Sequence, residues 1–117
     1  MDDEIGVDLR MECFEHLPVA VLAVSGDLDA ATAPKLHRRL EDLIDHGHRY
    51  ITVDLSGVRF LASAGLGVLI RALHQVRHHD GDLVLVCSQT HLRKAFETTG
   101  LDRVFDIHTT SDDAATA

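Results

Sequence analysis

Two short segments near the start of the chain predict a pair of β-strands. From Val7 to Cys13, apolar and polar residues alternate, which is typical of a half-buried strand near the edge of a sheet. The segment from Val19 to Ser25 is almost continuously apolar, which favours an interior strand that is covered on both faces and ends at Gly26. Residues 15–18 contain a proline and are expected to form the turn between the two strands. Together these patterns predict an antiparallel hairpin.

The following residues alternate between helical and strand patterns. We expect three helices, from about Ala33 to His46 with Thr32 as its N-cap, from about Ala64 to His79, and from about His91 to Thr99 with Ser88 or Thr90 as its cap. We expect three further strands, from Tyr50 to Leu55, from Leu83 to Cys87 and, more weakly, from about Val104 to Ile107. A loop from Ser56 to Ala62 is expected to connect the first of these strands to the second helix. The right-handed crossover in each strand–helix–strand unit makes its two strands parallel. The order β-β-α-β-α-β-α-β therefore predicts an α/β fold whose sheet is largely parallel from the second strand onward.

Length and charge limit the classes of protein to which the chain can belong. The 117 residues are expected to form a single domain, with a core from about residue 7 to residue 108 and a disordered tail from 109 to 117. A formal net charge of −8 argues against direct binding to nucleic acid, which requires a basic surface. No apolar run approaches the roughly 20 residues of a membrane span, and residues 1–4 are acidic, unlike a signal peptide. We therefore expect a cytoplasmic protein that binds other proteins. We do not expect it to bind a membrane or nucleic acid directly.

The cysteine and histidine residues do not form a recognisable metal-binding pattern. Cys13 and Cys87 lie in apolar segments without the spacing of metal ligands, so both are expected to be reduced, buried and inert. His74 and His78 have the i, i+4 spacing that places two imidazoles on one helical face, but no neighbouring Cys, Asp or Glu completes a set of ligands. We interpret these histidines as solvated side chains, and we expect neither a metal ion nor another cofactor.

Ser63 is the candidate functional residue, because it lies where the third strand connects to the second helix. In open α/β sheets, recognition and catalysis concentrate at such strand ends. Two interpretations remain open: the hydroxyl is an N-cap of the helix, or it is presented to another molecule. An N-cap alone does not account for Gly65 and Gly67, each of which costs the helix up to about 1 kcal/mol and would let another backbone approach closely. Phe60 and Leu61 are either core residues or part of an exposed docking surface.

A phosphate group on Ser63 fits this position in the chain. The first turn of a helix presents unpaired N–H groups, which tolerate a dianion. The same phosphate adds about −1.5 to −2 charges to the surface, so it can repel a partner without any change of fold. The sequence therefore favours Ser63 as a phosphorylation site that controls protein binding.

Three motifs give the chain a family resemblance. They are Gly26-Asp27-Leu28-Asp29, Val53-Asp54-Leu55-Ser56-Gly57-Val58 and Ser63-Ala64-Gly65-Leu66-Gly67-Val68-Leu69. From about Val7 to Ile107, the chain resembles the anti-sigma factor antagonists, which are small STAS domains. The resemblance implies an STAS-type mixed β-sheet of about five strands with three to four helices.

The resemblance also implies a partner switch. In that family the unphosphorylated antagonist binds an anti-sigma factor that has an ATP-binding serine kinase domain, and this frees the sigma factor for transcription. Phosphorylation of a serine that corresponds to Ser63 releases the partner, and a serine phosphatase removes the phosphate. The chain would then be a substrate and a binding protein and not an enzyme, because the ATP belongs to the kinase.

The partner-binding surface is assigned through the same resemblance. Asp29 corresponds to an aspartate that similar proteins place near the phosphorylation site, although a carboxylate here also fits a turn or a helix cap. The residues expected to bind the partner are Asp27, Asp29, Gly57, Phe60, Leu61, Ala62, Ala64, Gly65 and Gly67. The chain departs from the family pattern at Ala62, where an Asp is usual, and at Ala64, where a second hydroxyl is usual. The alanine at position 62 removes a carboxylate that can cap the helix or align the hydroxyl for a kinase.

Three other functions, those of a scaffold, a hydrolase and a response regulator, make different demands on the sequence. A constitutive scaffold, for example a subunit of a lipid-transport or sensory complex, would keep the STAS fold and use Ser63 only as a cap. A hydrolase would need a glycine two residues before the nucleophile and an acid–histidine pair at later strand ends, and neither is found. A response regulator with Asp54 as phosphoacceptor would need an acidic pair after the first strand and a lysine late in the chain. Asp54 is instead expected to order the residues that follow it.

Overall fold

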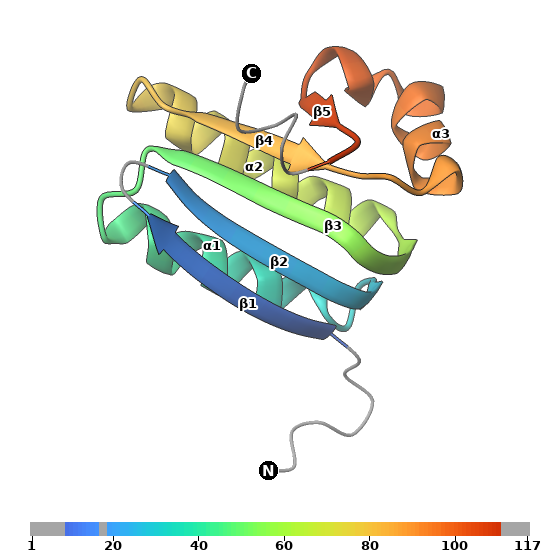
Figure 1. Cartoon of the computed structure of the whole chain (residues 1–117), viewed down its shortest axis with the longest axis horizontal. Coiled ribbons are helices and arrows are strands. Elements are labelled where there is room, and N and C mark those ends of the chain that lie inside the picture. The colour runs from blue at the N-terminus through green and yellow to red at the C-terminus, as the bar shows by residue number, and fades with distance from the viewer. Residues whose placement is uncertain (1–8, 17–18, 111–117) are drawn as a thin grey trace, which may run out of the picture.

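The computed structural model describes residues 9–16 and 19–110 and contains a five-stranded mixed sheet (Figure 1). The elements are β1 (Leu9–His16), β2 (Val19–Leu28), α1 (Ala33–Asp45), β3 (Tyr50–Leu61), α2 (Ser63–His78), β4 (Asp82–Val86), α3 (Thr90–Thr99), the 3-10 helix η1 (Leu101–Arg103) and β5 (Asp106–His108). The strands lie in the order β1-β2-β3-β4-β5. β1 pairs antiparallel with β2, and every later pair of neighbours is parallel. The predicted element order, the hairpin and the parallel pairing from the second strand onward are therefore confirmed.

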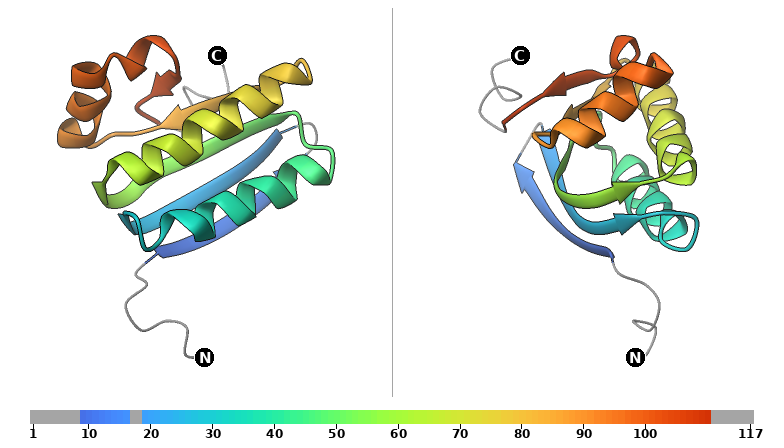
Figure 2. Two further views of the ribbon diagram at one scale, coloured as in Figure 1. Left: turned by 180° about the vertical axis from the view of Figure 1, so that it is seen from behind. Right: turned by 90° about the vertical axis from the view of Figure 1, so that its right-hand side faces the viewer.

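Helices α1 and α2 lie side by side on one face of the sheet (Figure 2). On β2, Ala20, Leu22 and Val24 are buried beneath these helices, whereas Val21 and Ala23 point to the opposite face and are only half-buried. The prediction that this strand is covered on both faces is therefore wrong. An apolar run does not distinguish a strand between two layers of helices from one whose second face is shielded only by the neighbouring strands.

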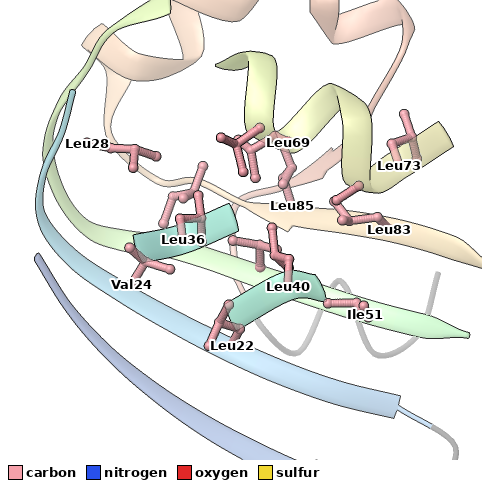
Figure 3. Packing of buried hydrophobic residues seen from close by; sticks show 14 of the residues in the cluster. Leu22, Val24, Leu28, Leu36, Leu40, Ile51, Leu69, Leu73, Leu83 and Leu85 are labelled. Atoms are coloured by element: carbon pink, nitrogen blue, oxygen red, sulfur yellow. The ribbon is translucent and has the colours of Figure 1, made fainter. Parts of the chain in front are cut away.

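The hydrophobic core lies between this sheet face and the two helices (Figure 3). Leu36 and Leu40 of α1, together with Leu69 and Leu73 of α2, are no more than 1% exposed. The strand residues of the same cluster include Leu22, Val24, Leu28, Ile51, Leu83 and Leu85. Burial of a leucine side chain stabilises the fold by roughly 1.5–3 kcal/mol. This packing fixes the start of α2 against the ends of the central strands.

The two central strands are longer than their sequence patterns predict. The sequence predicts ends at Gly26 and Leu55, whereas β2 continues to Leu28 and β3 to Leu61. The pairing between the two strands shifts twice in this stretch, and β3 holds one extra residue at each shift. Such β-bulges break the alternation of buried and exposed positions, so the segment resembles a loop in sequence. The predicted loop from Ser56 to Ala62 is therefore almost entirely strand.

Only part of the prediction for the chain ends falls on described residues. β1 continues to His16, beyond the expected end at Cys13. Val7 and residues 17–18, at which the first strand and its turn were expected, lie outside the described residues. Most of the predicted tail, residues 111–117, also lies outside them.

The third helix begins one residue earlier than expected. It starts at Thr90 with Gln89 in the N-cap position, so neither Ser88 nor Thr90 is the cap. The last strand covers Asp106–His108 and is therefore shifted toward the C-terminus from its predicted position. A helix boundary without a capping side chain leaves little signal in the sequence.

Candidate functional site

The ends of β2 and β3 meet the first turn of α2 at one end of the sheet (Figure 1). We call this region the Ser63 corner and define it as residues 27–28 and 60–65. The strand ends are paired residue by residue up to the last residue of each strand. Beyond the pairing, the Ala62 N–H donates a hydrogen bond of 2.8 Å to the Leu28 carbonyl. Backbone hydrogen bonds thus fix the corner up to the residue before Ser63.

Ser63 is the first residue of α2, and its side chain is exposed. Ala62 holds the N-cap position, and no side chain caps this helix. Within the described part of the chain, the Ser63 hydroxyl has no hydrogen-bond partner. The interpretation of Ser63 as an N-cap is therefore wrong, because its position, one residue inside the helix, does not direct the hydroxyl at the free N–H groups. The hydroxyl is accessible to another molecule.

The glycines after Ser63 have two different roles. A Cβ on Gly65 would lie 2.5 Å from Cγ of Leu28 and 3.2 Å from Cδ1 of Leu61, so this glycine lets α2 pack directly on the strand ends. Gly65 is buried, and the side chains that approach it closely are Leu28 and Leu61 of this chain and not those of another molecule. A Cβ on Gly67 would meet only the guanidinium of Arg71, at 3.8 Å. Gly67 therefore leaves open space on the outside of α2.

The apolar residues of the corner divide into exposed and packed ones. Phe60 is 54% exposed, whereas Leu61 is half-buried and packs against the core. Ala62 and Ala64, on either side of Ser63, are also half-buried. The sequence leaves open whether Phe60 and Leu61 are core residues or exposed. In the structure Phe60 is exposed and Leu61 packs on the core, because alternate residues of a strand point to opposite faces.

Asp27 forms an ion pair with Arg59 at the Ser63 corner. Its carboxylate lies 3.3 Å from Nε of Arg59, and both side chains are largely solvated. An exposed pair of this kind contributes at most about 1 kcal/mol. The backbone carbonyl oxygen of Arg59 lies 3.0 Å from Nε2 of His91 in α3, within range to accept a hydrogen bond from it. Charged and polar groups from three elements therefore surround the strand ends.

Asp29 organises the turn between β2 and α1. Its Oδ1 accepts hydrogen bonds from the backbone N–H groups of Ala31 at 3.0 Å and of Thr32 at 3.1 Å. Thr32 holds the predicted N-cap position, but its hydroxyl points back to the strand, where it donates to the Asp27 carbonyl at 2.8 Å and accepts from the Asp29 N–H at 2.9 Å. The turn-forming role that the sequence allows for Asp29 is therefore present.

Gly57 does not lie beside Ser63. It lines a cavity of about 550 Å³ together with Arg10, Ser25 and Asp54. Ala23 and Asp54, which also line this cavity, alternate with the buried residues of β2 and β3, so the cavity lies on the sheet face opposite α1 and α2. The structure thus separates Gly57 from the other residues expected to bind a partner. Asp54 accepts a hydrogen bond of 2.9 Å from the Ser56 N–H, so it orders the residues that follow it, as predicted.

Gln89 holds the bulged part of β3, and sequence reasoning missed it. Its Nε2 lies 2.8 Å from the Leu55 carbonyl oxygen, 2.9 Å from that of Ser56 and 2.6 Å from that of Val58. An amide group has two N–H donors, so these are shared among the three acceptors. The bulges leave carbonyls without a partner strand, and Gln89 satisfies them. Gln89 is needed because the bulged part of β3 has carbonyls to satisfy. The sequence pattern does not place these bulges, so it does not single out Gln89.

The cysteines and the histidine pair lie outside the Ser63 corner. Cys87 is buried, and burial raises the pKa of its thiol. Cys13 is half-buried, and neither cysteine forms a disulfide. His74 and His78 are both exposed. Among the described residues, no three His, Cys, Asp or Glu side chains are gathered where they could hold a metal ion.

Across residues 9–16 and 19–110, none of the helices has both the length and the apolar character needed to cross a membrane.

Comparison with known proteins identifies one family. The family described as "STAS domain" matches residues 10–114. The chain is 31% identical over 103 residues to an anti-sigma-B factor antagonist of Listeria monocytogenes, and the match covers 88% of each chain. It is 30% identical over 105 residues to the anti-sigma-F factor antagonist RsfB of Mycobacterium tuberculosis, which covers 87% of this chain and 83% of RsfB. A crystal structure of an anti-sigma factor antagonist from Mycobacterium paratuberculosis has a TM-score of 0.86 at 30% identity, and the match covers 92% of each chain.

Proposed function

This chain belongs to the STAS domain family, and we propose that it is an anti-sigma factor antagonist regulated by phosphorylation of Ser63. In its unphosphorylated form it binds an anti-sigma factor that carries a serine kinase domain. Phosphorylation of Ser63 by that kinase releases the complex, and a serine phosphatase restores binding. The chain acts as a cytoplasmic binding protein and kinase substrate, and not as an enzyme. The proposed activity draws support from relatives named as anti-sigma factor antagonists.

The observation that carries the proposal is the state of the Ser63 hydroxyl. It is exposed at the start of α2, and no described residue bonds to it. A kinase needs a hydroxyl that can enter its active site, and a buried or bonded hydroxyl would first have to be released. The packing of Gly65 on Leu28 holds the helix start in place, so the hydroxyl is presented on a rigid support.

The alanine at position 62 is compatible with a phosphate on Ser63. Because no side chain caps α2, the first N–H groups of the helix are not occupied by a neighbouring carboxylate. A phosphate beside these N–H groups is stabilised by the helix dipole. An aspartate at position 62 would instead repel it. The departure from the family pattern thus changes how the phosphate is held and leaves the acceptor in place.

The surroundings of Ser63 fit a docking surface for a protein. Phe60 presents an aromatic ring that is 54% exposed, three residues before Ser63. Aromatic side chains of this kind are typical anchors in protein interfaces. The pair of Asp27 and Arg59 supplies charge next to the ring. A phosphate that appears at this edge adds negative charge inside the contact area, where like charges cost the most.

The test is a binding and phosphorylation experiment with the purified serine-kinase anti-sigma factors encoded by the same genome. We expect one of them to bind the chain, to phosphorylate Ser63 in the presence of ATP, and to lose affinity by tenfold or more for Ser63→Asp. Titration calorimetry gives the affinities, and mass spectrometry gives the site of phosphorylation. Gln75→Glu is the matched control, because it adds one negative charge at an exposed position of the same helix and should leave binding unchanged.

Two results would contradict the proposal. If phosphate appears on another residue or on none, Ser63 is not the switch. If Ser63→Asp binds as tightly as the unchanged chain, the protein is a constitutive scaffold.

A further inference from the structure

Helices α1 and α2 lie side by side (Figure 2), and residues of both helices, Ser63 among them, line a groove. Its volume is about 520 Å³. Among the residues that line it are Ala33, Pro34 and His37 of α1 and Ser63, Gly67 and Arg71 of α2. Most of this lining is apolar or small, and Arg71 is its one side chain with a permanent positive charge. The candidate phosphorylation site and an arginine therefore share one groove.

Arg71 is directed toward Ser63. The two residues are eight positions apart on α2, a rise of about 12 Å along the helix axis. Nη1 of Arg71, however, lies 3.8 Å from the point that a Cβ on Gly67 would occupy, which is one turn closer to Ser63. Helical side chains point toward the N-terminus, which accounts for this direction. The absence of a side chain at Gly67 leaves the space between them open.

Arg71 is also free to accept a new partner. It is exposed, and among the described residues it has neither a hydrogen bond nor an ion pair. Arg59, the other arginine near Ser63, is already paired with Asp27 at 3.3 Å. Across the groove, His37 lies 3.3 Å from the Glu41 carboxylate. The groove thus holds one unpaired cation, and it shares that groove with the unpaired hydroxyl.

We propose that Arg71 binds the phosphate group of phosphorylated Ser63. Ser63 and Gly67 are one turn apart, a rise of about 6 Å, and rotation of the Ser63 side chain turns a phosphate from the first N–H groups of α2 toward this interval. Rotation of the two side chains brings the guanidinium and the phosphate oxygens into contact, and the backbone stays in place. Arginine and phosphate form strong, often bidentate, charge-assisted hydrogen bonds.

This pairing gives phosphorylation a second effect on the surface. The phosphate fills the groove next to Ser63, and it takes the charge of Arg71 away from any partner that approaches α1 and α2. The release of a partner then depends on an occupied groove as well as on added negative charge. The inference rests on the proposed phosphorylation of Ser63, but its chemistry can be tested without the kinase.

The experiment uses full-length protein with phosphoserine incorporated at position 63 during translation. A ³¹P NMR titration measures the second pKa of the phosphate, which is about 6 for an isolated phosphoserine. We expect Arg71→Gln to raise this pKa by about half a unit to one unit, because a nearby cation favours the dianion. Arg71→Lys should give an intermediate value. Arg38→Gln, which removes an exposed arginine of α1 outside the groove lining, should change nothing.

A second measurement on the same samples is the ¹⁵N shift of the Arg71 Nε–H, which should move when Ser63 carries phosphate. The inference is wrong if Arg71→Gln and Arg38→Gln give the same phosphate pKa, or if the Nε–H signal does not respond. Failure of the proposed function looks different, because a chain that no kinase modifies would still show the paired phosphate in this experiment.

Discussion

The two helices that lie side by side on the sheet begin with hydroxyl side chains in opposite states. Thr32, before α1, is 1% exposed, and its hydroxyl bonds to the backbone of Asp27 and Asp29. Ser63, at the start of α2, is exposed and has no bond to the described residues. Both follow a parallel strand, and both residue types are common at helix starts. Burial and hydrogen-bond partners, more than residue type, therefore separate the structural hydroxyl from the functional one.

The largest expected effect on stability is that of substituting Thr32. Thr32→Val keeps the shape of the side chain but leaves the Asp27 carbonyl and the Asp29 N–H without their buried partner. We expect the free energy of unfolding to fall by about 1–3 kcal/mol, measured by urea denaturation. Thr32→Ser retains the hydroxyl and should recover most of the loss. If Thr32→Val is as stable as the unchanged chain, the Thr32 hydroxyl is not structural, and the contrast between Thr32 and Ser63 does not hold.

The glycines of α2 offer a matched pair of intermediate size. Gly65→Ala places a Cβ 2.5 Å from Leu28, so overpacking should outweigh the gain in helix propensity. We expect a loss of about 1–2 kcal/mol. Gly67→Ala meets no atom closer than 3.8 Å, and a gain of about 0.5–1 kcal/mol follows from propensity alone.

Thermal or urea denaturation of both variants measures this difference. If both glycine variants are equally stable, the contact between α2 and the strand ends is looser than the structure indicates.

The smallest effect on stability is expected at Ser63 itself. Ser63→Ala removes a hydroxyl that has no partner among the described residues, so the free energy of unfolding should change by less than about 0.5 kcal/mol. The same variant should accept no phosphate at this position from the cognate kinase. Denaturation and mass spectrometry on one preparation give both readouts. A loss of stability comparable to that of Thr32→Val would mean that Ser63 is structural.

Local patterns were sufficient to predict the element order and the place of Ser63. Alternation gave the first strand, helical spacing gave α1 and α2, and the strand-to-helix junction placed Ser63 at the surface end of the sheet. Each of these signals depends only on residues that are close together in the chain. The position of Phe60 and the packing of Gly65 were not predictable, because they depend on contacts between β2, β3 and α2.

The strand ends show why long-range contacts limit such predictions. Two bulges change which residues of β3 face the helices. Gly57 is a local hint of the first bulge, since a glycine within a strand often marks one, but it does not show which residues then face the helices. The exposure of Arg71 in a groove with Ser63 likewise depends on how α1 packs against α2. Gly67 is the one local hint of that groove, since a glycine inside a helix has a cost that needs a reason.

Gln89 has a consequence for any shortened form of this protein. It lies after β4, yet its amide bonds to carbonyls of β3 beyond the part that pairs with β4. A truncated chain that stops at Val86 would retain four of the five strands and both helices of the main layer, but those carbonyls would lose their donor. The bulged part of β3 that leads into Ser63 would then be held by its pairing with β2 and no longer by Gln89. Shortened forms of the chain intended for partner screening should therefore include Gln89.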